Sequence, residues 1–210
     1  MRTSVRLVIG LIALVLLPAV SMAARPAPRP DDMTLGNPKA KVVVVEYASL
    51  SCPHCARFHA DVFPAFRKTY IDSGKVQFIY REFVTRPAEI AVPGTMLARC
   101  AGKDRYFQVI ERAFAVQAEI YEDGTVGGVH RILRREAAAL GMDGAQYDAC
   151  LRDEAAFEAL KARLDRAETE DKVTGTPTFE VNGKRIAPPL GKEMDLATLD
   201  AAIRAAARGK

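Results

Sequence analysis

The chain has 210 residues, of which 49% are hydrophobic and 27% charged, and this composition excludes a disordered or fibrous protein. The length suits one core, or a core with an insertion, and is short for two full domains. The net charge is +4 and the acidic and basic residues are interspersed, so we expect no nucleic-acid partner. Four cysteines are too few for a small disulfide scaffold but enough for two pairs.

Residues 1–23 have the features of a secretory signal peptide. Arg2 and Arg6 precede the apolar run Leu7 to Ala19. Ser21-Met22-Ala23 then supplies the small residues that signal peptidase requires. A membrane anchor is the alternative, but a spanning helix needs about 20 apolar residues and this run is shorter. We therefore expect cleavage before Ala24 and export to the bacterial periplasm, where disulfides persist.

Residues 24–40 are expected to form a linker, because Arg25 to Pro30 is a polyproline-type segment that cannot pack. The first core element follows at Val42 to Tyr47. This run of β-branched residues shows no alternation, which predicts a strand buried on both faces.

The next two elements complete a β-α-β unit over residues 41–86. A helix is expected from about Pro53 to Tyr70, with its apolar residues on one stripe. Pro64 lies inside this segment and should kink the helix, since an interior proline costs about 3 kcal/mol. Val76 to Glu82 alternates in hydrophobicity and predicts the second strand.

Residues 87–172 have a helical pattern throughout, with glycine breaks that predict about four to five helices. Residues 173–210 begin with two short strands and a hairpin turn, namely Thr178 to Val181, Asn182-Gly183, and Lys184 to Ile186. Asp195 then caps a final helix, Leu196 to Arg208. The predicted fold is therefore α/β, with a sheet built from both ends of the chain and an all-helical domain inserted between its halves.

Cys52-Pro53-His54-Cys55 is the motif that indicates chemistry. Both thiols lie at the start of a helix, directly after a buried strand, where unpaired N–H groups and the helix dipole favour a thiolate at Cys52. His54 adds a partly cationic ring beside the sulfur. Such surroundings lower a cysteine pKa and favour redox work. A zinc site would need two more ligands and no second close pair exists, so redox exchange is favoured over zinc or a purely structural disulfide.

The sequence around this motif resembles the active site of the DsbA-like thiol:disulfide oxidoreductases. These are thioredoxin-fold proteins with a helical insertion, and the resemblance rests on Val45 to Cys55 followed by Phe58-His59. Near the other end of the chain, Val173 to Phe179 resembles the cis-proline loop of the same family. The likeness extends from about Lys41 to Arg208.

The resemblance implies a role for each matching residue. Cys52 matches the exposed nucleophile and Cys55 its buried partner, so that a redox-active disulfide serves in place of any cofactor or metal. Pro53 and His54 match the dipeptide that sets the redox potential. The other matches are a buried proton-transferring acid, Glu46, and a substrate-pairing cis-proline loop, Thr176 and Pro177. For Glu46, a solvated strand position is the alternative. The best-known members have valine where this chain has Thr176.

The remaining cysteines and histidines are assigned structural roles. Cys100 and Cys150 both fall in the helical block, where a disulfide between them would contribute about 4 kcal/mol. Two free thiols or a second redox pair are the alternatives. His59 is expected to be a packing or solvent-exposed residue, and His130 has no partner that the sequence identifies.

The sequence therefore predicts a periplasmic oxidase that introduces disulfides into exported proteins through Cys52 and Cys55. The expected partners are unfolded polypeptides with free cysteines and a membrane quinone-linked reoxidase of the DsbB type. We expect a monomer. The alternatives are a disulfide isomerase or reductase of the same fold, and a non-catalytic adaptor that binds peptides.

Overall fold

The computed structural model describes residues 28–209, so the predicted signal peptide lies outside the described residues. In chain order the strands are β1 (Met33–Gly36), β2 (Val42–Ala48), β3 (Val76–Glu82), β4 (Thr178–Val181) and β5 (Lys184–Ile186). The helices before and within the insertion are α1 (Pro53–Asp61), α2 (Phe63–Phe66), α3 (Ala88–Cys100), α4 (Lys103–Ala115), α5 (Gln117–Asp123), α6 (Val126–Ala139), α7 (Gly144–Leu151) and α8 (Glu154–Thr169). The last helix is α9 (Leu196–Ala207), and a π-helical turn, Arg67–Ile71, follows α2.

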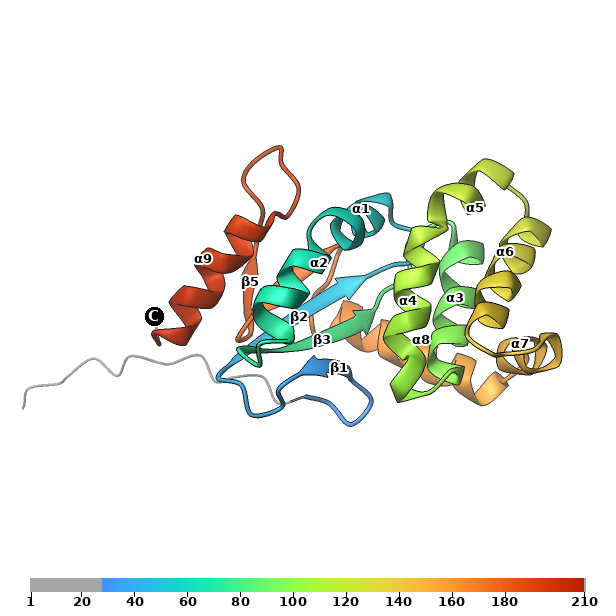
Figure 1. Ribbon diagram of the computed structural model, residues 1–210, viewed down its shortest axis with the longest axis horizontal. Helices are drawn as coiled ribbons and strands as arrows, with labels where there is room; N and C mark the ends of the chain where they lie inside the picture. The colour runs from blue at the N-terminus through green and yellow to red at the C-terminus, as the bar shows by residue number, and fades with distance from the viewer. Residues whose placement is uncertain (1–27, 210) are drawn as a thin grey trace, which may run out of the picture.

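The strands form one sheet in the order β1-β3-β2-β4-β5. Strands β2 and β3 are parallel, and every other neighbouring pair is antiparallel. Helices cover both faces of the central strand β2. Val42 and Val44 pack into the larger core with residues of α1 and α9, whereas Val43 and Val45 pack with Ala167 of α8. The predicted strand buried on both faces is confirmed, and Figure 1 shows the sheet between these helices.

Helices α3 to α7 gather beyond one end of the sheet, as Figure 1 shows, and α8 returns the chain to it. This insertion lies between β3 and β4, as predicted, and its described residues form six helices rather than four to five. The additional boundary falls at Val116, between α4 and α5, where no glycine or proline marks it in the sequence. Cys100, at the end of α3, forms a disulfide with Cys150 in α7, which is the pairing the sequence favoured.

Three predicted elements differ from the structure. The expected helix from Pro53 to Tyr70 is interrupted at Val62, and Pro64 lies in the first turn of α2, where no N–H is required. Strand β3 is buried almost throughout rather than on alternate residues, because helices cover both faces of the sheet.

The third difference concerns the predicted linker at residues 24–40. Within it, β1 pairs antiparallel with β3, for example Met33 opposite Tyr80, so the linker prediction is wrong for this segment. Four residues with a single buried side chain are too few to give a recognisable strand pattern.

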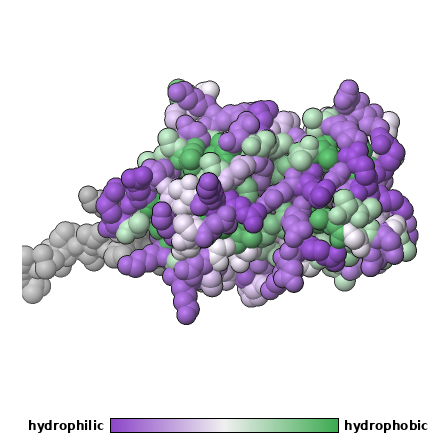
Figure 2. Space-filling model, viewed as in Figure 1, coloured by the Kyte–Doolittle hydropathy of each residue, from purple (hydrophilic) through white to green (hydrophobic). Residues whose placement is uncertain are grey.

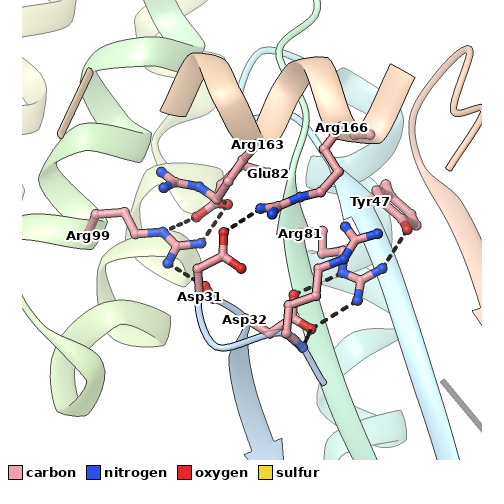
Figure 3. A pocket seen from close by; sticks show the side chains of 10 residues that line it. Asp31, Asp32, Tyr47, Arg81, Glu82, Arg99, Arg163 and Arg166 are labelled. Carbon is pink, nitrogen blue, oxygen red and sulfur yellow. Dashed lines mark hydrogen bonds and ion pairs between the residues drawn. The ribbon is translucent and has the colours of Figure 1, made fainter. Parts of the chain in front are cut away.

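Ion pairs hold the segment before β1 against the sheet and α8, as Figure 3 shows. Asp32 pairs with Arg81 of β3, and Asp31 pairs with Arg166 of α8. At the end of β3, the buried Glu82 accepts hydrogen bonds from Arg99 and from Arg163. None of these contacts was predicted, because no local spacing connects the groups.

The exposed surface is mostly hydrophilic on the face shown in Figure 2, with separate smaller hydrophobic areas. Among residues 28–209, no helix has the length and apolar character needed to cross a membrane.

Candidate functional site

The Cys52–Cys55 motif opens α1, directly beyond the carboxyl end of the central strand β2. Cys52 is the N-cap residue, with extended backbone, and Pro53 occupies the first turn. The helix therefore presents its first N–H groups toward the Cys52 sulfur, as the sequence predicts. Backbone N–H groups of His54 and Cys55 are among the donors that lower the pKa of Cys52.

The two thiols have opposite electrostatic surroundings. A hydrogen bond from the Cys55 thiol, aided by Thr176 and the helix N–H groups, outweighs partial burial and lowers the pKa of Cys52 to about 5. Burial instead raises the pKa of Cys55 well above its usual value, and the nearby Cys52 and Glu46 add to the effect. At neutral pH one sulfur is therefore a thiolate and the other a thiol. Both are free in this structure.

Cys52 is less exposed than the sequence analysis expected, since only 6% of its surface is accessible, against none for Cys55. The loop from the other half of the sheet accounts for this cover. The Cys52 sulfur lies 3.3 Å from the carbonyl oxygen of Thr176, and the Thr176–Pro177 peptide bond is cis, as predicted. The hydroxyl of Thr176 is buried and has no hydrogen-bond partner among residues 28–209, which leaves it free to donate to a Cys52 thiolate.

Beneath the helix, Glu46 is fully buried on β2, so the alternative of a solvated strand residue is wrong. Its carboxylate contacts His59 of α1, with Nε2 lying 3.0 Å from Oε2 and 3.2 Å from Oε1. His59 is buried as well, with 3% of its side chain accessible. The sequence assigned His59 to packing or solvent and missed this pair, although its i,i+4 spacing from Cys55 placed both residues on one face.

The His54 ring occupies a different position from the one expected. It is 60% exposed, and its Nδ1 lies 2.9 Å from a carboxylate oxygen of Glu193, in the loop before α9. Arg57 donates to the same oxygen from Nε at 2.8 Å. Glu193 therefore binds both His54 and Arg57, although it lies far from them in the sequence. No local signal could have identified Glu193.

Helix α5 of the insertion holds the loop that precedes Cys52. The Gln117 side chain donates to the carbonyl oxygens of Leu50 and Cys52, at 2.8 and 3.2 Å. The Tyr121 hydroxyl donates to the Ser51 carbonyl at 2.5 Å. Helix α5 therefore positions the redox motif, through contacts that no local pattern in the sequence indicates.

The other side chains that could bind a metal have partners of their own. Cys100 and Cys150, which a zinc site could have recruited, are bonded to each other. His130 contacts the hydroxyl of Tyr147 at 2.9 Å, which gives it the partner that the sequence did not identify. Within residues 28–209, no three cysteine, histidine or acidic side chains gather as metal ligands would.

Comparison with known proteins agrees with this geometry. The family model described as "Thioredoxin" matches residues 29–205. A protein of Rickettsia bellii named "Putative protein-disulfide oxidoreductase" is 35% identical over 154 residues. That match covers 73% of this chain and 58% of the relative, so the chain spans little more than half the length of the curated relative.

Solved structures match over nearly the whole described fold. Wolbachia pipientis alpha-DsbA1 is 27% identical with a TM-score of 0.74, over 87% of this chain and 94% of that one. A protein-disulfide isomerase from Novosphingobium aromaticivorans is 27% identical with a TM-score of 0.72, over 85% and 97%. On its family model, its relatives and its fold, the chain belongs to the thioredoxin family as a DsbA-like protein.

Proposed function

We propose that this protein is a periplasmic thiol:disulfide oxidase that introduces disulfide bonds into exported polypeptides through Cys52 and Cys55. The observation that carries the proposal is the asymmetry of the two thiols. The pKa of Cys52 is lowered to about 5 at a helix N-terminus, whereas the pKa of Cys55 is raised by burial. Interactions that stabilise the thiolate stabilise the reduced form, so the disulfide passes its oxidation on readily.

The reaction begins from the Cys52–Cys55 disulfide. A substrate thiolate attacks the Cys52 sulfur, the bond to Cys55 breaks, and Cys55 leaves as a thiolate that takes up a proton. A second substrate thiolate then attacks the substrate sulfur of this mixed disulfide. The substrate leaves with its own disulfide, and Cys52 is released as a stabilised thiolate. Two electrons have passed from the substrate to the enzyme.

The cis-proline loop supplies a surface for an extended polypeptide. The backbone of Thr176 lies beside the Cys52 sulfur, and strand-like pairing there reads main chain rather than side chains. A pocket of about 440 Å³ next to it is lined by Phe58, Pro177 and Met194, among others. These features suit unfolded substrates of varied sequence.

Two further parts of the proposal concern the cell. Reoxidation of Cys52 and Cys55 would require a membrane quinone-linked partner of the DsbB type. Export would depend on the segment 1–23, and the mature protein should begin at Ala24. Fractionation of the producing bacterium followed by N-terminal sequencing tests the location. Recovery of the uncut chain from the cytoplasm would contradict it.

The enzymatic test is oxidation of a reduced dithiol peptide by stoichiometric oxidised protein. We expect one disulfide formed per protein within a single turnover, and no reaction from Cys52→Ser. Equilibration with glutathione should show a pair that is mostly reduced under conditions that keep ordinary structural disulfides oxidised. A pair as reducing as those structural disulfides would exclude the oxidase.

A disulfide isomerase is the second candidate, and the Novosphingobium relative named as an isomerase is the observation that favours it. An isomerase acts from the reduced form, so reduced protein should reactivate a scrambled substrate catalytically. An oxidase should do so only weakly. A peptide-binding adaptor would keep its activity when Cys52 and Cys55 are both replaced by serine, whereas either enzyme would lose it.

A further inference from the structure

Glu46, His59 and Cys55 form a buried group beneath the redox motif, and it carries an inference that rests on the proposed function. Cys55 and His59 are one helical turn apart on α1, on its buried face. Glu46 contacts His59 directly, and its charge acts on the Cys55 thiol. The carboxylate therefore interacts with both the buried sulfur and the imidazole.

The imidazole has one nitrogen that the protein does not use. Nε2 faces Glu46, but Nδ1 is buried and has no hydrogen-bond partner among the described residues. His59 also lines a pocket of about 250 Å³ between α1, α2 and α4. Arg67 and Glu111 line the same pocket and are 39% and 40% exposed, so it reaches the surface. The pocket therefore gives the ring a route to solvent.

The remaining groups around the ring cannot take its place. Phe114 stacks on it at 4.4 Å and Phe63 lies at 4.7 Å, both apolar. Tyr80 lies 6.1 Å away, and burial raises its pKa well above the usual value, so it stays neutral. The cation nearest the pocket mouth, Arg67, already pairs with Glu111 at 2.7 Å. His59 is thus the group through which the buried carboxylate can be compensated.

We infer that His59 is a positioning residue that keeps this buried site electrically neutral during thiol-disulfide exchange, by releasing or taking up a proton at Nδ1 through the pocket. In the reduced protein, Glu46 is a carboxylate and His59 an imidazolium. In the oxidised protein, Glu46 is a carboxylic acid and His59 is neutral. A single uncompensated charge would be costly at this depth, and neither state contains one.

The step that closes the Cys52–Cys55 disulfide shows how the protons balance. Starting from a mixed disulfide at Cys52, the Cys55 sulfur attacks Cys52 and the bond to the other partner breaks. That partner leaves with the electron pair as a thiolate. The Cys55 proton moves to Glu46, directly or through one water. His59 then loses its charged neighbour and releases the Nδ1 proton into the pocket. Substrate oxidation runs the same steps in reverse.

Infrared and NMR spectroscopy of the wild-type protein test the inference without any variant. The oxidised-minus-reduced infrared spectrum should show a carboxylic acid band that Glu46→Gln removes. Nitrogen NMR should show both His59 ring nitrogens protonated in the reduced form and one in the oxidised form. A Glu46 that remains ionised, or a His59 that remains neutral, in both redox states would overturn the inference.

The variant His59→Gln keeps an amide donor for Glu46 but cannot carry the charge. Glu46 should then stay protonated in both redox states. Closure of the mixed disulfide formed with glutathione should be slower by about tenfold to a hundredfold at pH 7. His130→Gln, the same change at a histidine in the insertion, should have no effect. Wild-type closure kinetics in His59→Gln would count against the inference.

The two proposals fail separately in these experiments. If the wild-type protein does not exchange disulfides with glutathione at all, the proposed function fails. If it exchanges normally but the protonation of Glu46 and His59 is the same in both redox states, only the inference about His59 fails.

Discussion

Glu46 and Glu82 are two fully buried carboxylates on neighbouring parallel strands, and they differ in the partners they have. Glu82 accepts hydrogen bonds from the guanidinium groups of Arg99 and Arg163 and from the Tyr106 hydroxyl. Burial alone would raise the pKa of Glu82, but these partners outweigh it and hold the pKa below its usual value. Glu46 has His59 as its ionisable hydrogen-bond partner.

The difference decides what each acid can do. A guanidinium is always protonated, so the charge on Glu82 is fixed and its contacts stabilise the junction between β3, α3 and α8. An imidazole gains and loses its proton near neutral pH, so the charge on Glu46 can change during a reaction. By the inference above, one buried acid belongs to a structural ion pair and the other to a pair that exchanges protons.

Glu82→Gln should have the largest effect on stability. It removes the carboxylate that Arg99 and Arg163 share, and breaking a buried pair in this way costs about 3–5 kcal/mol. Urea unfolding at pH 7 measures this loss, while the rate of thiol-disulfide exchange should be unchanged. A loss below 1 kcal/mol would show that the cluster in Figure 3 is not a stabilising one.

The same variant gives the pH dependence of that stability. The pKa of Glu82 is lowered on folding, so its contribution is complete above the unfolded value of about 4.3 and is lost as the pH falls through the lower folded value. The stability difference between wild type and Glu82→Gln should therefore be constant from pH 5 to pH 7 and shrink at lower pH. A difference that grows on acidification would contradict the assignment.

Glu46→Gln should show the opposite pattern. The amide can still accept a hydrogen bond from His59, and a neutral His59 leaves no buried charge uncompensated, so the free energy of unfolding should change by no more than about 1 kcal/mol. Closure of the mixed disulfide at Cys52 should nevertheless slow by at least about tenfold, because Cys55 loses its proton acceptor. Stopped-flow kinetics beside urea unfolding test both halves. A loss of stability with unchanged closure kinetics would show that Glu46, like Glu82, has only a structural role.

Thr176→Val extends the comparison to the charge on Cys52, which neutral donors stabilise. Removing the hydroxyl should raise the pKa of Cys52 from about 5 and make the thiol about tenfold less acidic, since a hydrogen bond to a charged group contributes about 1.5–3 kcal/mol. Thiolate absorbance against pH measures it. An unchanged titration would leave the helix N–H groups and Cys55 as the relevant donors.

Glu193→Gln should have the smallest effect, because this third acid is exposed. Its pKa is lowered to about 2 by hydrogen bonds from Arg57 and His54, but exposed pairs contribute little. Freeing both groups should lower the pKa of Cys52 slightly and favour the reduced form. Titration of the Cys52 thiolate at low salt measures this change in pKa. The change should shrink at high salt, which screens exposed charges. A rise in the Cys52 pKa would reverse the assigned role of Glu193.

Much of the site was predictable, because its main parts are local or carried by family resemblance. Cys52, Pro53 and Cys55 follow from their spacing at a predicted strand-to-helix junction. Thr176 and Pro177 follow from a second motif, and their approach to Cys52 follows from the order of elements. The burial of Glu46 was implied by the family resemblance, with a solvated strand position left as the alternative.

The predictions failed where a single residue's surroundings mattered. In the sequence His59 has the pattern of an ordinary helical residue. Only the fold brings it into contact with Glu46 of β2. The exposure of Cys52 was overestimated because the cover from the Thr176 loop depends on the final fit of the two halves. Strand β1 was missed because its pairing with β3 compensates for a weak pattern of its own.

The sequence by itself determined the alternation of strands and helices, the redox motif and the cis-proline loop, since each depends on residues close together in the chain. Only the tertiary structure decided which charges meet. Glu46 of β2 pairs with His59 of α1, Glu82 of β3 pairs with Arg99 of α3 and Arg163 of α8, and His54 of α1 pairs with Glu193 in the loop before α9. In all three cases the partner lies outside the element that holds the first residue. The physical reason is that an ion pair depends on distances of a few ångströms and on burial, and packing sets both.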